Sequence, residues 1–526
     1  MTMIPSLFNS TIPSCACSAA SFSYPDLFGA EFLSLETKFV ANYSTSIHTG
    51  LYTNHGAVTV SNVNFCNITV TYTHPGQNDS VHVQVWLPSD TWNGRLQHIG
   101  GAGWQAGLHT AGLMGMMASV GEGYATVGTD AGLGSDVYPT NWALLSEGNV
   151  NLYLLQNLAT VSLNDASVIA KSLATSFYKT APKYSYFSGC SQGGRQGLQL
   201  AQRYPDAYDG IAASAPAINW NQFVMQDLWP LFLMDQMGVY PPACELDAIT
   251  DAALNACDGL DGIVDGVIND PDSCNFDPAS LIGTTINCTT LGSDLVISTE
   301  AVDLVQKIWD GAKRSDNSTI WYGPSKGASL TGSITDIAIV PTTCASNGTC
   351  TRGSFEIAED WAKLFVLKNS SASTINISHE EFDRIAHLSA QMYESIIGTR
   401  DPDLSEFRAR GGKLVGYHGT TDTIIPTRGS THYYDAVTAV DADVHDFYRL
   451  FLAPGVNHCF GGNGAYPAGT FDAMREWVEN GIAPETLAAT SLDSTPTFER
   501  ALCPYPKKQV YDGVGNATAG EGFTCM

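Results

Sequence analysis

A serine in the pentapeptide Gly189-Cys-Ser-Gln-Gly193 has the type and spacing of a nucleophile for acyl transfer. The G-x-S-x-G pattern places serine on a sharp turn between a strand and a helix, where flanking glycines leave room for close backbone approach. The run 184–188 before it favours a strand, and the residues after it have helical spacing. The pattern predicts that Ser191 is the nucleophile and that the N–H of Gln192 faces the oxyanion.

A second oxyanion donor should follow an early strand. The glycine-rich segment 100–103 comes directly after the expected strand 96–99. Gly101 is the preferred donor and Gly103 the next choice, while a plain tight turn is the alternative for this segment.

The base and acid should lie downstream of the serine, in the order Ser, Asp, His, each after a strand. Asp422 follows the strand-like run 413–417, and His458 follows the run 447–452. Asp422 would fix the imidazole tautomer, and His458 would take the serine proton and return it to the leaving alcohol. His418 and His432 compete for the role of base. However, His418 precedes the acid and is expected to serve packing and hydrogen bonding, whereas His432 falls in a helical pattern and should be solvated.

Cysteines stand next to two of these residues. Cys190 precedes the nucleophile and Cys459 follows the base. A disulfide between them would clamp Ser191 and His458 together although they are far apart in the sequence.

Cys190-Ser191, Asp422 and His458-Cys459 resemble the CS-D-HC motif of the fungal tannase and feruloyl esterase family, and the resemblance covers most of the chain. It implies hydrolysis of phenolic-acid esters, either hydroxycinnamoyl esters on plant cell-wall sugars or galloyl esters in tannins, with the feruloyl type preferred. The residues alone indicate acyl-ester chemistry. A catalytically inactive hydrolase-fold binding protein is the alternative from another class.

The segment 257–267 alternates aspartates with glycines, a pattern typical of oxygen cages for hard cations. Its spacing is not that of an EF-hand, and a solvated acidic turn is the alternative reading. The resemblance implies a structural Ca²⁺ here, in a segment bounded by Cys257 and Cys274. The candidate ligands are the side chains of Asp258, Asp261 and Asp265 and the carbonyls of Ile263 and Val267.

The elements that must position these residues alternate between strands and helices from residue 81 onward, which predicts a mostly parallel, helix-covered sheet. Short antiparallel strands are expected before about residue 80. The alternation stops near residue 219 and resumes after residue 405. We therefore expect an α/β-hydrolase fold with a large inserted lid domain: a catalytic domain in residues 1–218 and 406–526, and a lid with the calcium loop in residues 219–405.

The inserted segment also contains seven aromatic residues that would either line an acyl pocket or form the core. These are Trp220, Phe223, Trp229, Phe232, Trp309, Trp321 and Tyr322. A dibasic pair, Lys313-Arg314, lies in a polar stretch, so we expect it to be exposed. It resembles a processing site of some fungal tannases, although an ordinary surface pair is the alternative.

Net charge and cysteine content restrict the partners and the compartment. A net charge of −27 disfavours nucleic acid and anionic membranes, which leaves a small ester as the expected partner. Thirteen cysteines predict disulfides, with Cys344–Cys350 and Cys503–Cys525 as pairs and Cys66 bonded to Cys15 or Cys17. The first twenty residues lack a signal-peptide pattern. The cysteines and ten N-glycosylation sequons nevertheless predict a secreted protein; the sequons are Asn9, Asn42, Asn67, Asn78, Asn287, Asn317, Asn347, Asn369, Asn376 and Asn516.

Overall fold

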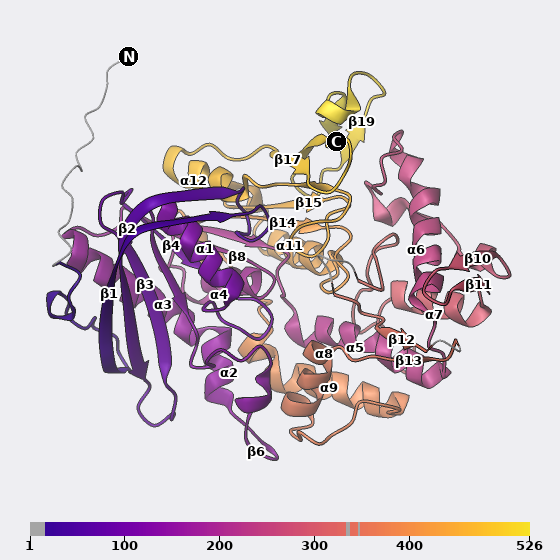
Figure 1. The fold of residues 1–526 in the computed structure, drawn as a ribbon, viewed down its shortest axis with the longest axis horizontal. Coiled ribbons are helices and arrows are strands. Elements are labelled where there is room, and N and C mark those ends of the chain that lie inside the picture. The colour runs from indigo at the N-terminus through magenta and orange to yellow at the C-terminus, as the bar shows by residue number, and fades with distance from the viewer. Residues whose placement is uncertain (1–15, 333–336, 346–347) are drawn as a thin grey trace.

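A nine-stranded mixed sheet forms the centre of the computed structural model, which describes residues 16–332, 337–345 and 348–526 (Figure 1). In sheet order the strands are β1 (Glu31–Ile47), β2 (Val58–Thr73), β3 (Val81–Pro88), β5 (Ala125–Thr129), β4 (Arg95–Ile99), β8 (Tyr184–Cys190), β9 (Gly210–Ser214), β14 (Lys413–Gly419) and β15 (Tyr448–Ala453). The strands from β5 to β15 run parallel. Their carboxyl ends share one edge, where loops can bring distant residues together.

Helices cover both faces of the parallel strands. On one face lie α3 (Val161–Tyr178), α4 (Gln192–Arg203) and α11 (Arg428–Val440). On the other face lie α1 (Thr110–Gly121) and α12 (Thr470–Asn480). The layered sheet confirms the predicted α/β class, and α12 ends at Gly481, whose positive φ of 70° suits a helix C-cap.

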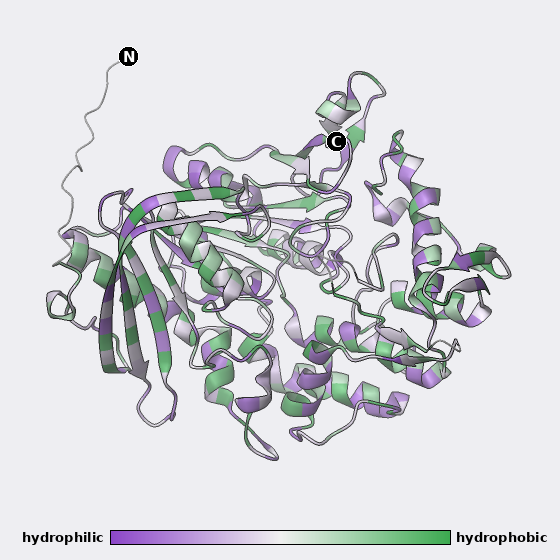
Figure 2. Ribbon diagram, in the orientation of Figure 1, coloured by the Kyte–Doolittle hydropathy of each residue, from purple (hydrophilic) through white to green (hydrophobic). Residues whose placement is uncertain are grey.

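The first two strands form a long antiparallel hairpin at the edge of the sheet. The short strands expected before residue 80 are parts of one long strand, β2. Polar residues along β2 made it look shorter in the sequence. Figure 2 shows polar and apolar residues alternating along this hairpin, as one buried face requires. The hairpin curves over the sheet, and its connection, residues 48–57, reaches the middle of the molecule (Figure 1).

Between β9 and β14 the described residues add no strand to the large sheet. This segment is mainly helical, with two small hairpins. Its elements are α5 (Trp220–Met237), α6 (Ala243–Cys257), β10 (Thr285–Cys288), β11 (Ser293–Val296), α7 (Thr299–Trp309), β12 (Thr342–Cys344), β13 (Cys350–Arg352), α8 (Glu356–Asp360), α9 (His379–Ile397) and α10 (Ser405–Ala409). Its core is continuous with that of the sheet domain, because Trp104 packs on Phe365 and edge-on to Trp220.

The remaining elements are short. They are β6 (Leu144–Ser146), β7 (Asn149–Val150), α2 (Leu152–Ala159), β16 (Ala465–Tyr466), β17 (Leu487–Ser491), β18 (Glu499–Leu502), β19 (Gln509–Tyr511) and β20 (Phe523–Cys525). The hairpin β19–β20 is tied to the body by the disulfide Cys503–Cys525.

Six disulfides join twelve of the thirteen cysteines. They are Cys17–Cys66, Cys190–Cys459, Cys244–Cys288, Cys257–Cys274, Cys344–Cys350 and Cys503–Cys525. Cys66 therefore bonds to Cys17, and Cys15 lies outside the described residues. The sequence could not assign Cys244 and Cys288, because nothing local to α6 and β10 indicates that they meet.

The dibasic pair at Lys313-Arg314 is half-buried rather than exposed. The Arg314 backbone is held in a turn by hydrogen bonds to Ser318 and Asn317, and the Lys313 carbonyl accepts from His379. The expectation of an exposed site was wrong because this polar stretch packs against α9.

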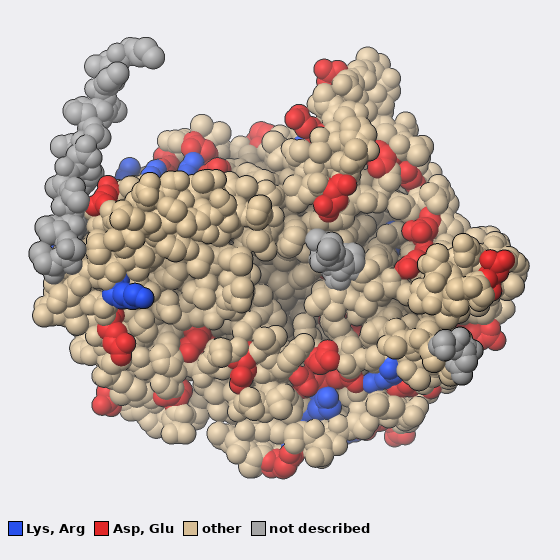
Figure 3. Space-filling model, viewed as in Figure 1, with Lys and Arg blue, Asp and Glu red and all other residues tan. Residues whose placement is uncertain are grey.

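Acidic side chains are scattered over the face shown in Figure 3, with few Lys or Arg among them. No basic patch offers a surface for polyanions on this face, in line with the net charge. In the described part of the chain, no helix has both the length and the apolar composition that crossing a bilayer requires.

Candidate active site

Ser191 occupies the turn between β8 and α4, with φ 63° and ψ −124°. A non-glycine residue in this region costs about 1–3 kcal/mol and persists only where the surroundings enforce it. A Cβ on Gly189 would lie 2.6 Å from the Gly193 backbone, so no side chain fits there. The turn therefore has the strained geometry that the pentapeptide predicts, with the serine at the N-terminus of a buried helix.

Asp422 follows β14 and is fully buried. Its Oδ2 accepts a hydrogen bond from His458 Nδ1 at 2.7 Å, and its Oδ1 accepts from the backbone N–H groups of Ile424 and Ile425. Burial alone would raise the pKa of this carboxyl, but His458 and His418 beside it hold the pKa well below its usual range. Asp422 is consequently an anion that keeps the proton of His458 on Nδ1 and leaves Nε2 as the basic atom.

His418 is the second imidazole on this carboxylate. Its Nε2 lies 3.0 Å from Asp422 Oδ2 and 2.9 Å from the Ile425 carbonyl, and its Nδ1 lies 2.8 Å from Ser430 Oγ. Because Nε2 faces two acceptors, it carries the proton and donates. His418 is thus buried beneath the acid as a hydrogen-bonding group, whereas His432 is exposed on α11 beside Tyr322.

A disulfide connects the nucleophile turn to the histidine loop. Cys190 and Cys459 are bonded with an S–S distance of 2.04 Å across a sequence separation of 269. The Cys459 carbonyl accepts a hydrogen bond from the buried Tyr417 hydroxyl, which further fixes this loop. Ser191 and His458 line the same cavity as a result.

The oxyanion side of the site differs from the expectation for Gly101. Its N–H donates to Gln196 Oε1 at 2.8 Å and its carbonyl accepts from Gly193, so both groups serve to dock the loop on α4. Gly103 also lines the cavity, and its carbonyl accepts from Gln192 Nε2 at 2.8 Å. Because the Gly101 N–H is occupied, Gly103, the next choice from the sequence, is the better candidate for the second donor. The roles of Gly103 and of the Gln192 N–H, at the start of α4, stay predictions.

The cavity beside Ser191 has a volume of about 730 Å³, enough for an aromatic ester. Five aromatic rings contribute to its wall: Tyr52, Trp104, Tyr138, Phe355 and Phe460. None of the seven aromatic residues singled out in the inserted segment is among its described lining residues; six are in the core and Tyr322 packs against it. The actual wall could not be predicted from the sequence, because these five rings come from five separate loops without a shared pattern.

Asp227, on α5, is a second buried acid near the site. Neither carboxyl oxygen has a hydrogen-bond partner in the described structure. Burial raises its pKa well above the usual range, and the nearby charge of Asp422 raises it further. Both effects favour the protonated form of Asp227, whereas Asp422 is held as the anion.

The candidate calcium loop folds around Asp258, whose carboxylate accepts from the N–H groups of Asp265, Gly266 and Val267. Burial raises the pKa of both Asp261 and Asp265. Oδ2 of Asp265 pairs with Arg500 at 2.5 Å, whereas its buried Oδ1 has no partner. Within the described ranges, no three His, Cys, Asp or Glu side chains converge as a metal cluster. A cation here would need backbone carbonyls as well, and the orphaned Oδ1 fits such an oxygen set.

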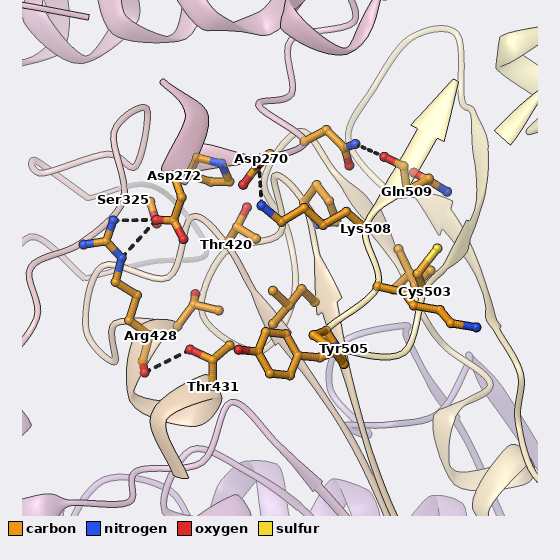
Figure 4. Close-up of a pocket in the computed structure, with 18 residues that line it drawn as sticks. Asp270, Asp272, Ser325, Thr420, Arg428, Thr431, Cys503, Tyr505, Lys508 and Gln509 are labelled. Atoms are coloured by element: carbon orange, nitrogen blue, oxygen red, sulfur yellow. Dashed lines mark hydrogen bonds and ion pairs between the residues drawn. The ribbon is translucent and has the colours of Figure 1, made fainter. Parts of the chain in front are cut away.

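A smaller cavity of about 120 Å³ lies between the inserted segment and the C-terminal region (Figure 4). Two ion pairs span it, Asp272–Arg428 and Asp270–Lys508. Asp270 is half-buried and the other three side chains are exposed, and the charges satisfy one another. Ser191 and His458 line the cavity of about 730 Å³ instead. The contacts tie the segment that follows the candidate calcium loop to α11 and to the residue before β19.

A parallel sheet with a nucleophile turn after β8, an acid after β14 and a histidine after β15 defines an α/β-hydrolase with the arrangement of an ester hydrolase. The family model described as tannase and feruloyl esterase matches residues 66–526. The chain belongs to this family of carboxylic-ester hydrolases.

Sequence and structure relatives carry both names of the family. A probable feruloyl esterase of Arthroderma benhamiae is 38% identical over 96% of this chain and 93% of its own. A tannase of Aspergillus oryzae is 28% identical over 87% and 85%. The tannin acyl hydrolase from Aspergillus niger superposes with a TM-score of 0.84 at 27% identity, covering 97% and 94%. Feruloyl esterase B from Aspergillus oryzae gives 0.77 at 25%, covering 95% and 97%.

Proposed function

We propose that this chain is a secreted serine esterase that hydrolyses phenolic-acid esters, of the feruloyl rather than the galloyl type. The observation that carries the serine mechanism is the disulfide Cys190–Cys459, because it joins the residue before the strained Ser191 to the residue after the Asp422-bonded His458, and both line one cavity.

In the proposed reaction, Ser191 Oγ attacks the ester carbonyl carbon while His458 Nε2 takes the hydroxyl proton. The oxyanion faces the N–H groups of Gln192 and Gly103. Collapse breaks the bond to the alcohol oxygen, which receives the proton from His458 and leaves. Water then attacks the acyl carbon, His458 takes its proton, and Ser191 departs protonated as the acid is released.

The cavity wall supports the feruloyl type. Its described side chains are mainly aromatic and aliphatic, with Ile99, Ile357 and Ile424 beside the aromatic rings. Gallate carries three hydroxyl groups, each of which needs a partner when it is buried, whereas ferulate carries one hydroxyl and a methoxy group. The 38% identical relative also bears the feruloyl esterase name. Tannase remains the second candidate, supported by the close superposition on the tannin acyl hydrolase.

Parallel assays of methyl ferulate, methyl caffeate and methyl gallate test this proposal. We expect kcat/KM for ferulate to exceed that for gallate by about tenfold or more. Preference for gallate would favour the tannase. Absence of turnover with all three esters, together with failure of a fluorophosphonate to label Ser191, would support the inactive binding protein instead.

We also propose that the loop 258–267 binds a structural Ca²⁺ through Asp258, Asp261, Asp265 and the carbonyls of Ile263 and Val267. The orphaned Asp265 oxygen and the repulsion between the half-buried Asp261 and its neighbours Asp265 and Asp258 support this proposal. When bound, the ion would supply charge neutralisation and hold the loop. The role is structural, because Ser191, His458 and Gly103 line a cavity that no residue of the loop 258–267 lines.

Removing calcium with a chelator should lower the Tm much more than the initial rate at 25 °C. A ligand at a hundred times its Kd stabilises the folded state by about 2.7 kcal/mol, and chelation removes that contribution. Thermal melts with and without chelator measure the shift. Asp265→Asn should abolish the chelator effect, while Asp294→Asn, on exposed β11, should retain it. An unchanged wild-type Tm would contradict the calcium proposal.

Secretion is supported by the disulfides and by the placement of the sequons. Of the sequons in the described residues, those at Asn42, Asn78, Asn287, Asn317, Asn369, Asn376 and Asn516 are exposed. Asn67 is half-buried in β2 between β1 and β3. We expect glycans on the exposed asparagines and none on Asn67, which peptide mapping after glycosidase treatment in ¹⁸O water would measure. Glycans confined to Asn67 or absent altogether would count against export through a glycosylating pathway.

A further inference from the structure

The hairpin connection, residues 48–57 between β1 and β2, forms part of the cavity although it precedes the residues that the family model matches. Leu51, Tyr52 and Thr53 line the same cavity as Ser191 and His458. Gly50 packs directly on Phe460, since a Cβ at Gly50 would lie 2.5 Å from that ring. One loop thus contacts both the nucleophile side and the histidine side of the site.

Asn54 is the innermost residue of this connection. It is fully buried and has φ 71°, a conformation that asparagine tolerates better than most residues. Its Nδ2 lies 3.1 Å from Ser188 Oγ, 3.2 Å from the Gly189 carbonyl and 3.3 Å from the Ala212 carbonyl. One side chain therefore joins the ends of β8 and β9 just below the nucleophile turn.

The Asn54 amide oxygen is connected to Ser191 through one intermediate residue, Ser214. Asn54 Oδ1 accepts from Ser214 Oγ at 2.5 Å. The Ser214 carbonyl in turn accepts from the Ser191 N–H at 3.1 Å. Asn54 itself is held from outside, because its carbonyl accepts from the Phe471 N–H at the start of α12.

We propose that Asn54 is a positioning residue for the nucleophile, holding the strained turn at Ser191 in register with His458. The turn's unfavourable φ needs surroundings that enforce it, and the Asn54 amide binds the residue before Cys190 and, through Ser214, the residue after it. A displacement of about 1 Å in such a site costs on the order of 100-fold in rate. Asn54 does not take part in proton transfer.

The test uses Asn54→Gly, which accepts the positive φ but removes the amide, and Asn54→Asp, which keeps the shape but turns an oxygen toward the Gly189 carbonyl. We expect kcat for p-nitrophenyl acetate to fall about 100-fold in both, with KM changed less than threefold. The second-order rate of fluorophosphonate labelling of Ser191 should fall in parallel. Asn62→Gly is the matched control, because Asn62 also has a positive φ but is exposed on β2.

A merely structural role would lower the Tm of Asn54→Gly and leave kcat and the labelling rate at 25 °C unchanged, which would overturn the inference. If Asn54→Asp does not fold, Asn54→Gly alone decides. The inference rests on the proposed serine mechanism, yet the two fail differently. Absence of labelling in the wild type would reject the mechanism, whereas equal labelling of wild type and Asn54→Gly would reject the role of Asn54.

Discussion

Replacing Ser191 with alanine should abolish ester hydrolysis, lowering kcat for methyl ferulate by roughly 10⁴ to 10⁶. Removing Oγ removes the atom that forms the acyl bond, and only substrate binding and the oxyanion donors remain. The fold should survive, because the change deletes one atom from a half-buried side chain. Steady-state kinetics and a thermal melt of the same preparation measure both quantities.

If Ser191→Ala retains more than a few per cent of wild-type kcat with an unchanged Tm, another residue is the nucleophile. Fluorophosphonate labelling followed by peptide mapping would then locate it. Loss of activity with a large loss of Tm would place Ser191 among structural residues only.

The second large effect concerns the two buried acids. Asp422→Asn should lower kcat by about 10⁴, because an amide beside His458 Nδ1 stabilises the tautomer that leaves Nε2 protonated and unable to accept the serine proton. Asp227→Asn is the matched control. Burial favours the protonated form of Asp227, with which an amide is nearly isosteric and isoelectronic, so kcat should stay within a few-fold of the wild type.

Asp227→Asn should also change how the free energy of unfolding depends on pH. The folded pKa of Asp227 is raised, so above the ordinary aspartate pKa the unfolded chain loses a proton that the folded chain keeps. This group therefore makes the free energy of unfolding of the wild type fall as the pH rises, by up to about 1.4 kcal/mol per pH unit. Asp227→Asn removes that loss, so its stability advantage over the wild type should grow from pH 4 upward in urea titrations. A constant difference from pH 4 to pH 7, or a kcat loss as large as that of Asp422→Asn, would refute the protonated state.

Much of the fold was predictable because its strands are short apolar runs with turn residues between them. The strand before Ser191 and the strand before Asp422 were both placed to within a few residues, as was α12 with its Gly481 stop. The hairpin β1–β2 was underestimated, since polar residues on its solvent face interrupt the apolar pattern.

The site was predictable only where chemistry and order along the chain coincide. Ser191 stands in a motif, and Asp422 and His458 follow it in the order that the fold class demands. Their contact at 2.7 Å agrees with this order, and their catalytic role remains a prediction. The choice between Gly101 and Gly103 lay beyond the sequence, because it depends on a hydrogen bond from the loop to Gln196 on another element.

The amino-acid sequence by itself determined the class of protein, the candidate nucleophile, acid and base, and the disulfide beside them, because each of these rests on local motifs or on adjacency along the chain. Only the tertiary structure decided the cavity wall, the partners of Cys66 and Cys244, the second imidazole on Asp422 and the place of Asn54 under the nucleophile turn. Most of these features join segments that are tens to hundreds of residues apart, and His418 meets Asp422 through the fold of the turn between them. Loop residues follow no periodic pattern, and their contacts are set by how the whole chain packs.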